Sequence, residues 1–363
     1  MFERVKPKGK KLLIDSLIYI NPIPFVYSNN LGLGDIYLGI DLDFGSKVYW
    51  NPTSAINSHL FIVGPSGSGK SVALSTISYR IAKKFKPIIT VFDIKTEYHY
   101  LFRISDLILN EFNPLKTPIP LCFCDDNKRD VEYSANAFLK AISKIYGVST
   151  SLYRNLYESI KYVCSRCESM EYLYNITENF EALNDIINVF EIYPSRDLDP
   201  LKNLLDKHSI VNLREIFLES STLSSLLITY IINNILKSHT LSFSNIPQRI
   251  VILDELWHVA PYIMDELVQI LTRYSRGYGI SIFMSTQNID DVGIYIDAVT
   301  SNCNLLLAMA SPIPGYWSKM ARYWNLSRRG IDKASSLDNQ GECVVRMYPY
   351  ENPMFVYIDP LDE

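Results

Sequence analysis

Apolar residues along this chain gather into short runs that end on glycine, an acidic residue or a small polar residue. Five such runs are HLFIVG (59–64), PIITVFD (87–93), RIVILD (249–254), GISIFMST (279–286) and CNLLLAMA (303–310). The middle of each run is almost continuously apolar, which is typical of parallel strands buried on both faces. Residues 71–85 have helical spacing and separate the first two runs. This strand–helix–strand order predicts an α/β fold with a mostly parallel sheet and helices on both faces.

The pattern changes near residues 58, 130 and 208, which suggests three regions, one of them in two segments. Residues 1–58 carry short β-like runs broken by glycine and proline, so we predict a small N-terminal β region there. Residues 130–208 have amphipathic helical spacing, and we interpret them as an all-helical insertion. Residues 59–129 and 209–363 are then expected to form one α/β domain. GECVVRMY and MFVYID supply a β pair at its C-terminal end.

Composition describes a folded protein of 363 residues, with 48% apolar and 20% charged residues. The net charge is 35 − 39 = −4, so no general basic coat indicates nucleic acid, although a few local cations would suffice to grip a phosphate backbone. The longest apolar stretch, 223–236, is too short and too polar to cross a bilayer. No signal-peptide core precedes Asp15. We therefore expect a cytoplasmic protein, with a peripheral position at the inner face of the membrane left open.

Six cysteines in a chain of this length do not suggest a disulfide framework. Cys122 and Cys124 form a C-x-C, and Cys164 and Cys167 form a C-x-x-C, a set that is able in principle to bind zinc. The second pair lies in a segment of helical periodicity, and neither pair has knuckle-like turn residues around it. We expect these cysteines simply to pack in the interior.

The segment GPSGSGKS (64–71) matches G-x-x-x-x-G-K-[ST] at every fixed position, between a predicted strand and a predicted helix. Its glycines let backbone N–H groups face phosphate oxygens at a helix N-terminus. Lys70 would bridge the β- and γ-phosphates, and Ser71 would ligate Mg²⁺. A purely structural glycine turn is the alternative, and the context makes it improbable. The residues expected to contact ATP are Gly64, Pro65, Ser66, Gly67, Ser68, Gly69, Lys70, Ser71 and Val72.

The strand RIVILDE (249–255) ends on two adjacent carboxylates. Asp254 would hold Mg²⁺ through water, and Glu255 would orient and deprotonate the attacking water. A polar strand end facing solvent is common by itself. Together with the phosphate loop, the doublet predicts ATP hydrolysis rather than simple nucleotide binding. A glutamate beside the magnesium aspartate also disfavours small GTPases and most kinases.

TRYSRGYGISIFMSTQ (272–287) places two arginines before a buried strand and an amide at its end. The strand would bring Gln287 to the sheet edge that holds Gly64 and Glu255, where an amide can sense the γ-phosphate or position water. Arg273 and Arg276 lie near the end of a predicted helix, where two cations complement the helix dipole. The alternative is that one of them reaches the nucleotide of a neighbouring subunit in a ring.

The order of these motifs resembles the HerA/FtsK superfamily of ring-forming ATPases, which includes ATPases of conjugation and type IV secretion. The resemblance rests on residues 57–72, 91–98, 250–261, 275–287, 301–312 and 337–347, and covers the chain from about residue 31 to its end. By motif position, Arg276 matches the R-x-x-G arginine, so the resemblance implies that Arg276 is the cation that reaches a neighbouring subunit and that Arg273 is a helix-end charge. Asp93 and Glu97 match a D-x-x-x-E element. STQ stands where the family more often has ATQ, and the N-terminal β region is shorter than in full HerA proteins.

The resemblance implies a RecA-like P-loop NTPase core and a homo-hexamer that uses ATP and Mg²⁺ to move DNA through a central pore. A nuclease partner, as in DNA repair, or a membrane DNA-transfer channel, as in conjugation, would accompany such a motor; a virus packaging motor is a further variant. The short N-terminal region puts a nuclease-docking role in doubt. One alternative is a type IV secretion-type ATPase that powers export of protein subunits or pili without touching DNA. Another is a nucleotide-dependent switch that barely hydrolyses, against which Glu255 argues.

Overall fold

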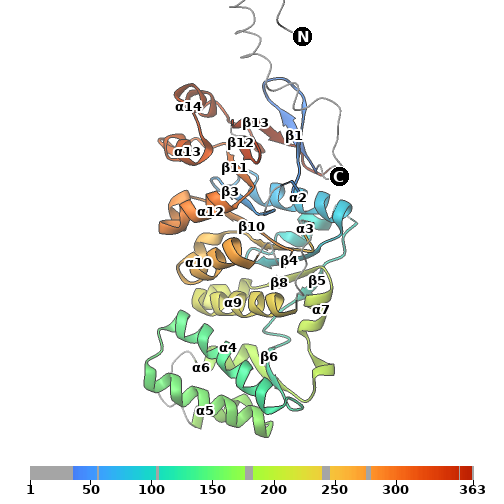
Figure 1. The fold of residues 1–363 in the computed structure, drawn as a ribbon, viewed down its shortest axis with the longest axis vertical. Helices are drawn as coiled ribbons and strands as arrows, with labels where there is room; N and C mark the ends of the chain where they lie inside the picture. The colour runs from blue at the N-terminus through green and yellow to red at the C-terminus, as the bar shows by residue number, and fades with distance from the viewer. Residues whose placement is uncertain are drawn as a thin grey trace, which may run out of the picture.

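The structure, a computed structural model, describes residues 36–361 except 55–56, 104–105, 176–182, 239–245, 275–278 and 351. The first 35 residues of the predicted N-terminal β region and Arg276 therefore lie outside the described part of the chain. Figure 1 shows an elongated molecule whose long axis runs from strands β1 and β13 at one end to helices α4 and α5 at the other.

A single sheet of eleven strands runs through most of the molecule, in the order β2-β1-β13-β12-β11-β3-β10-β9-β4-β8-β5. The strands are β1 (Ile36–Asp41), β2 (Lys47–Trp50), β3 (Leu60–Val63), β4 (Ile88–Asp93), β5 (Asn110–Phe112), β8 (Ser209–Asn212), β9 (Arg249–Leu253), β10 (Ile280–Thr286), β11 (Leu305–Met309), β12 (Glu342–Met347) and β13 (Met354–Ile358). The two described strands of the N-terminal region extend this sheet, because β1 pairs with β13.

The seven strands from β11 to β5 are parallel to one another, as the uninterrupted apolar runs predicted. Numbered along the chain, the five central strands β3, β4, β9, β10 and β11 lie in the order 5-1-4-3-2. The strand before the phosphate loop, β3, is thus separated from the strand before the acidic doublet, β9, by β10 alone. Ligands of such sheets bind beyond the carboxyl ends of the strands, where the strand order reverses.

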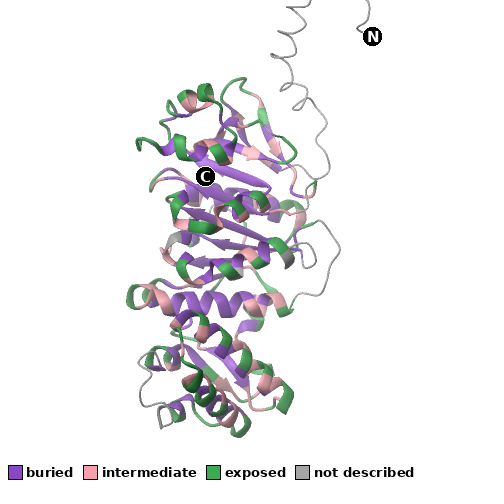
Figure 2. Ribbon diagram, turned by 60° about the vertical axis from the view of Figure 1, so that its left-hand side comes forward, coloured by how far each residue is buried: buried purple, intermediate pink, exposed green. Residues whose placement is uncertain are grey.

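Both faces of the sheet are covered, and Figure 2 shows its strands buried between layers with exposed outer surfaces. Alternate residues of β3 belong to different cores, Leu60 and Ile62 to one and Phe61 and Val63 to the other. The helices are α2 (Lys70–Phe85) and α3 (Tyr98–Arg103) with the first core, and α8 (Arg214–Glu219), α9 (Ser221–Ser238), α10 (Ala260–Gln269), α12 (Ile296–Asn302), α13 (Tyr316–Trp324) and α14 (Arg328–Ala334) with the second. None of the helices described is both long and apolar enough to cross a bilayer.

The segment predicted to be all-helical is mainly so, but one strand interrupts it. Its helices are α4 (Lys128–Tyr146), α5 (Thr150–Arg166), α6 (Leu183–Val189) and α7 (Leu201–Asp206). Strand β7 (Phe190–Tyr193) pairs with β6 (Ile119–Phe123) in a separate two-stranded parallel sheet. The helical interpretation of residues 190–193 (FEIY) was wrong, because four residues are too few to distinguish the period of a helix from that of a strand.

The insertion shares its core with the ATPase-like domain instead of forming a separate one. The ring of Tyr230 on α9 meets the rings of Phe138 on α4 and Phe190 on β7 edge-on, with centroids 6.1 and 5.1 Å apart. Its hydroxyl donates to the carbonyl oxygen of Pro120 at 3.1 Å. Such aromatic pairs add stability beyond the area they bury, so the insertion is held against α9 by a specific contact. The boundaries at 58, 129 and 208 stay a prediction.

The expectation that Cys122, Cys124, Cys164 and Cys167 merely pack, without disulfides, was wrong. Disulfides join Cys122 to Cys164 and Cys124 to Cys167, linking β6 to the end of α5. The sequence placed Cys167 within a helix, but it is the C-cap of α5 in left-handed conformation, with φ 55°. Neither β6 nor this helix end is visible in the apolar period, so the pairing could not be foreseen. Cys303 and Cys343 are free and buried.

The two disulfides predict a measurable dependence on reductant. The intact oxidised chain should have a mass about 4 Da below that of the reduced chain. Because each bridge closes a loop of 42 or 43 residues, chain entropy gives about 4 kcal/mol for one bridge. Reduction should therefore lower Tm by several degrees, and a Cys124→Ser/Cys167→Ser variant should lose part of that response. A mass and a Tm that reductant leaves unchanged would show that the bridges do not form.

Candidate active site

The phosphate loop runs from the end of β3 into α2, and glycine is required in it for two reasons, close packing and left-handed backbone. A Cβ on Gly64 would lie 2.6 Å from the Cβ of Met309, so close packing against β11 excludes any side chain there. Gly67 and Gly69 have φ of 78° and 98°, in the left-handed region. Gly69 is also the N-cap of α2, a position without a side-chain cap. The first N–H groups of α2 are therefore left to an anionic ligand.

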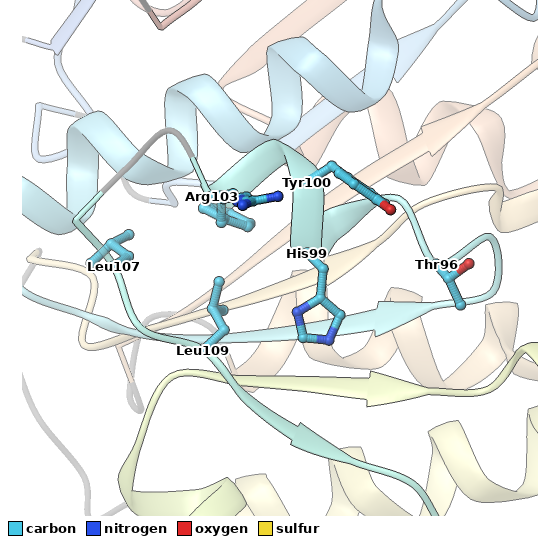
Figure 3. Close-up of a pocket in the computed structure, with 7 residues that line it drawn as sticks. Thr96, His99, Tyr100, Arg103, Leu107 and Leu109 are labelled. Atoms are coloured by element: carbon cyan, nitrogen blue, oxygen red, sulfur yellow. The ribbon is translucent and has the colours of Figure 1, made fainter. Parts of the chain in front are cut away.

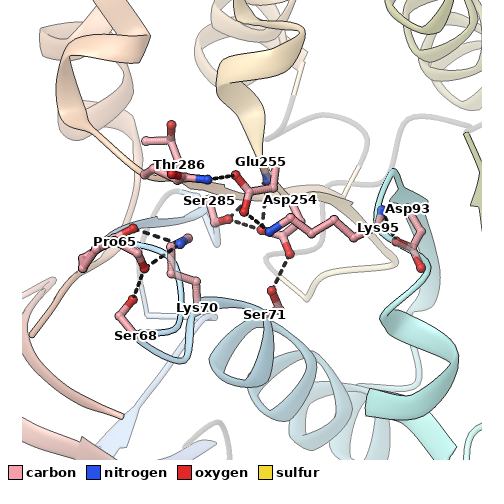
Figure 4. Close-up of polar contacts among 12 residues, drawn as sticks. Pro65, Ser68, Lys70, Ser71, Asp93, Lys95, Asp254, Glu255, Ser285 and Thr286 are labelled. Atoms are coloured by element: carbon pink, nitrogen blue, oxygen red, sulfur yellow. Dashed lines mark hydrogen bonds and ion pairs between the residues drawn. The ribbon is translucent and has the colours of Figure 1, made fainter. Parts of the chain in front are cut away.

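Lys70 is buried within this loop, with 5% of its surface exposed. Its ammonium donates to the carbonyl oxygens of Gly64 and Pro65 at 2.9 and 3.0 Å (Figure 4). Burial lowers the pKa of Lys70, while the charges of Glu255 and Asp254 act in the opposite direction. The side chain is folded back on its own loop, at the place where the sequence predicted a phosphate-binding cation.

Asp254 lies at the carboxyl end of β9 and faces the phosphate loop. One oxygen, Oδ2, accepts hydrogen bonds from the hydroxyls of Ser71 at 2.7 Å and Tyr98 at 3.0 Å. The other, Oδ1, accepts from the hydroxyl of Ser285 (Figure 4). A carboxylate beside a serine hydroxyl is a hard-oxygen donor set of the kind that Mg²⁺ prefers. Ser71 and Asp254, paired by the sequence as metal ligands, are therefore adjacent and fit a magnesium ion.

Glu255, the next residue, is buried and has an unusual backbone. It is 1% exposed and adopts φ 56°, which costs a non-glycine residue on the order of 1–2 kcal/mol. This conformation turns the chain at the end of β9. Its Oε2 accepts from the amide Nε2 of Gln287 at 3.0 Å, and its Oε1 forms an ion pair with Lys95. Gln287 thus lies at the same edge as Glu255, as the sequence predicted.

Asp93, at the end of β4, shapes the backbone instead of facing the phosphate loop. Its Oδ1 accepts from the N–H groups of Lys95 and Thr96 at 3.0 and 2.7 Å, and its Oδ2 from that of Tyr98 at 3.0 Å. Burial raises the pKa of Asp93, and these backbone bonds oppose the rise. Glu97, the second carboxylate of the D-x-x-x-E element, is exposed. Asp93 therefore fixes the turn that positions Lys95 and Tyr98.

Three residues around the doublet were not foreseen as site residues, namely Lys95, Tyr98 and Ser285. The first two lie in VFDIKTEY, which the resemblance marked only for its acids. Burial, then the charge of Asp254, raises the pKa of Tyr98 well above its usual value, so the phenol stays a donor. Of the earlier candidates, Arg276 and the side chain of Arg273 are outside what the structure describes. Pro65, Ser66, Ser68 and Val72 lie in the loop or the first turn of α2.

Two hollows lie near these elements. A cleft of about 280 Å³ adjoins the phosphate loop, with residues 310–312 and 335–340 as its other walls. The wall at 335–340 is tied to the loop, because the N–H of Gly341 donates to the carbonyl oxygen of Ser68 at 3.1 Å. A second hollow of about 560 Å³ lies beside α3, between His99, Tyr100, Arg103 and Leu109 among others (Figure 3). It contains none of the predicted site residues.

These features define a P-loop NTPase. A glycine-rich loop opens a helix, and a serine of that helix contacts an aspartate that is followed by a glutamate. The loop and the two acids follow strands β3 and β9, which are separated by β10. A family model described as "Helicase HerA, central domain" matches residues 36–239, more than half of the chain. The chain belongs to this family. The HerA/FtsK resemblance and the α/β fold that it implied are confirmed.

Two kinds of relative accompany this match. The chain is 26% identical to the DNA import protein CedB of Sulfolobus acidocaldarius over 384 residues, which cover 97% of this chain and 62% of that protein. The structure is similar to VirB4 of Thermoanaerobacter pseudethanolicus, with TM-score 0.66, 14% identity, and 91% and 97% of the two chains covered. It is also similar to the bacterial conjugative coupling protein TrwB in its unbound form, with TM-score 0.61, 15% identity, and 93% and 90% covered.

Removal of the carboxylate at position 255 should separate binding from chemistry. If Glu255 is the general base that the sequence predicts, Glu255→Gln removes it and leaves the loop untouched, so turnover should fall by about 10²–10⁴-fold. Binding of a nucleotide, followed by fluorescence of a labelled analogue, should change little. Glu215→Gln, at an exposed position on α8, is the matched control and should keep full turnover. Unchanged turnover in Glu255→Gln would remove this residue from the chemistry.

Proposed function

We propose that this protein is an ATPase that works as a homo-hexamer and moves DNA through its central pore, in a DNA-transfer process. The observation that carries the proposal is the contact of Ser71 with Asp254, beside buried Glu255. This arrangement provides a metal site and a base on the same side of one phosphate loop. It is suited to hydrolysis, whereas a protein that only binds nucleotide does not need the second carboxylate.

Each residue has a defined part in the proposed reaction. Lys70 leaves the loop carbonyls to hold the β- and γ-phosphates, which the N–H groups at the start of α2 also bind. Ser71 and Asp254 would hold Mg²⁺, which would neutralise charge on the phosphates. Glu255 accepts the proton of the attacking water, and Gln287 orients that water or reports the γ-phosphate.

The proposal of DNA as the transported substrate rests on relatives. The CedB relative is a DNA import protein, and TrwB is a conjugative coupling protein. Because this chain spans about 62% of the CedB relative, the whole-protein activity does not follow from the match alone. A nuclease partner and a membrane DNA-transfer channel stay predictions.

Stimulation of ATP hydrolysis by DNA tests the proposal. We expect ATPase activity to rise several-fold with double- or single-stranded DNA, and the rise to weaken with salt as phosphate contacts are screened. Lys70→Ala should abolish both basal and stimulated turnover. Nucleotide hydrolysis without stimulation and without salt-dependent DNA binding would reject the translocase, and would favour the ATPase that exports protein subunits.

Arg276 provides the test of a ring. If it reaches the nucleotide of a neighbour, Arg276→Ala should abolish hydrolysis while nucleotide binding stays intact, since such a residue contributes roughly 10³-fold or more. Doped into wild-type rings, the variant should reduce activity by more than its share of subunits. A strictly proportional loss, measured across a series of mixing ratios, would mean that each subunit acts alone.

A further inference from the structure

Lys95 lies between the turn after β4 and the acidic doublet after β9. Its ammonium forms an ion pair with Oε1 of Glu255, and 35% of the lysine side chain is exposed against 2% of the glutamate side chain. Figure 4 shows the side chain reaching from the β4 turn across to Asp254 and Glu255. Glu255 is thus a buried charge whose partner is half-exposed and retains access to solvent.

This ion pair leaves Glu255 unsuited to act as a base. Oε1 is held by Lys95, and Oε2 accepts from Gln287 at 3.0 Å. A general base must accept a proton from water at one of its oxygens, within hydrogen-bond reach. In this arrangement both oxygens are engaged by protein donors. The carboxylate is therefore held inactive, and its contact with Lys95 or with Gln287 must break before it can accept a proton.

Lys95 is placed at this point by the backbone rather than by chance. Its own N–H donates to Asp93 at 3.0 Å, and the next residue, Thr96, has φ 61°. Burial opposes the charge on Lys95, but the hydrogen bond and charge of Glu255 raise its pKa. The lysine is therefore held as a cation at one end of a rigid turn.

The phosphate loop lies close to the same ammonium. Ser71, at the end of the loop, donates to Asp254 at 2.7 Å, and the next residue, Glu255, is paired with Lys95. The charge of Lys95 also acts to lower the pKa of Lys70. A triphosphate bound on the loop would bring several negative charges to this place. Those charges would compete with Glu255 for Lys95, because charge-assisted hydrogen bonds to phosphate are strong.

We propose that Lys95 is a positioning residue that holds Glu255 inactive until the terminal phosphate of bound ATP takes over its ammonium. Oε1 of Glu255 is then free to accept a proton from water. The water oxygen bonds to the terminal phosphorus as the bond to the bridging oxygen of ADP breaks, and ADP leaves with that electron pair. This step rests on the ATPase activity proposed above. Because ADP lacks the terminal phosphate, ADP would not draw Lys95 away, and Glu255 would stay inactive.

Nucleotide affinity tests the transfer of Lys95 without any hydrolysis. In a Glu255→Gln background, Lys95→Met should weaken binding of a non-hydrolysable ATP analogue by about tenfold, since one charge-assisted contact is lost, and leave ADP binding unchanged. Lys95→Arg should restore the preference for the triphosphate. Lys83→Met, a substitution of an exposed lysine of α2 paired with Asp106, should change neither affinity. Equal losses for both nucleotides, or none, would overturn the proposal.

The two levels of the proposal fail differently. If the wild-type protein binds the ATP analogue and ADP but shows neither basal nor DNA-stimulated hydrolysis of ATP, the proposed function is wrong. The role of Lys95 in releasing a base is then wrong as well. If ATP is hydrolysed while Lys95→Met has the same affinities for the ATP analogue and for ADP as Lys83→Met, only the role of Lys95 is rejected.

Discussion

Burial of opposite charges at one sheet edge is the constraint on which this structure depends. Lys70, Asp93, Asp254 and Glu255 are each less than 8% exposed, and they lie beyond the carboxyl ends of neighbouring strands. An isolated charge in such a place costs several kcal/mol. Each is therefore compensated, by loop carbonyls, by backbone N–H groups, by hydroxyls or by Lys95. A nucleotide and its metal would have to replace some of these contacts in order to bind.

The fold supplies the rigid support that this charge cluster requires. Parallel strands buried on both faces bring β3, β10 and β9 together, so that their ends cannot move independently. The tail of the chain adds a second tie, because Gly341 at the start of β12 bonds to the phosphate loop. At the other side, the insertion packs its aromatic residues on α9.

The parts of the site that the sequence revealed are those encoded locally. The phosphate loop follows from the glycine pattern at 64–71, and the acidic doublet from an apolar strand that ends on Asp254 and Glu255. Gln287 was foreseen at the right edge because parallel strands end together. Lys95, Tyr98 and Ser285 escaped notice, since their partners lie 160, 156 and 31 residues away. Their contacts depend on strand order and register, which no local period contains. The disulfides escaped for the same reason.

Bound ATP should rearrange this site within a ring of subunits. Cryo-electron microscopy of the protein with Mg²⁺, a non-hydrolysable ATP analogue and DNA would show the rearrangement. We expect a six-fold ring with DNA in its pore, Lys95 on the terminal phosphate, and Glu255 facing a water. A single subunit that encloses the nucleotide alone, with Lys95 still paired to Glu255, would refute the mechanism.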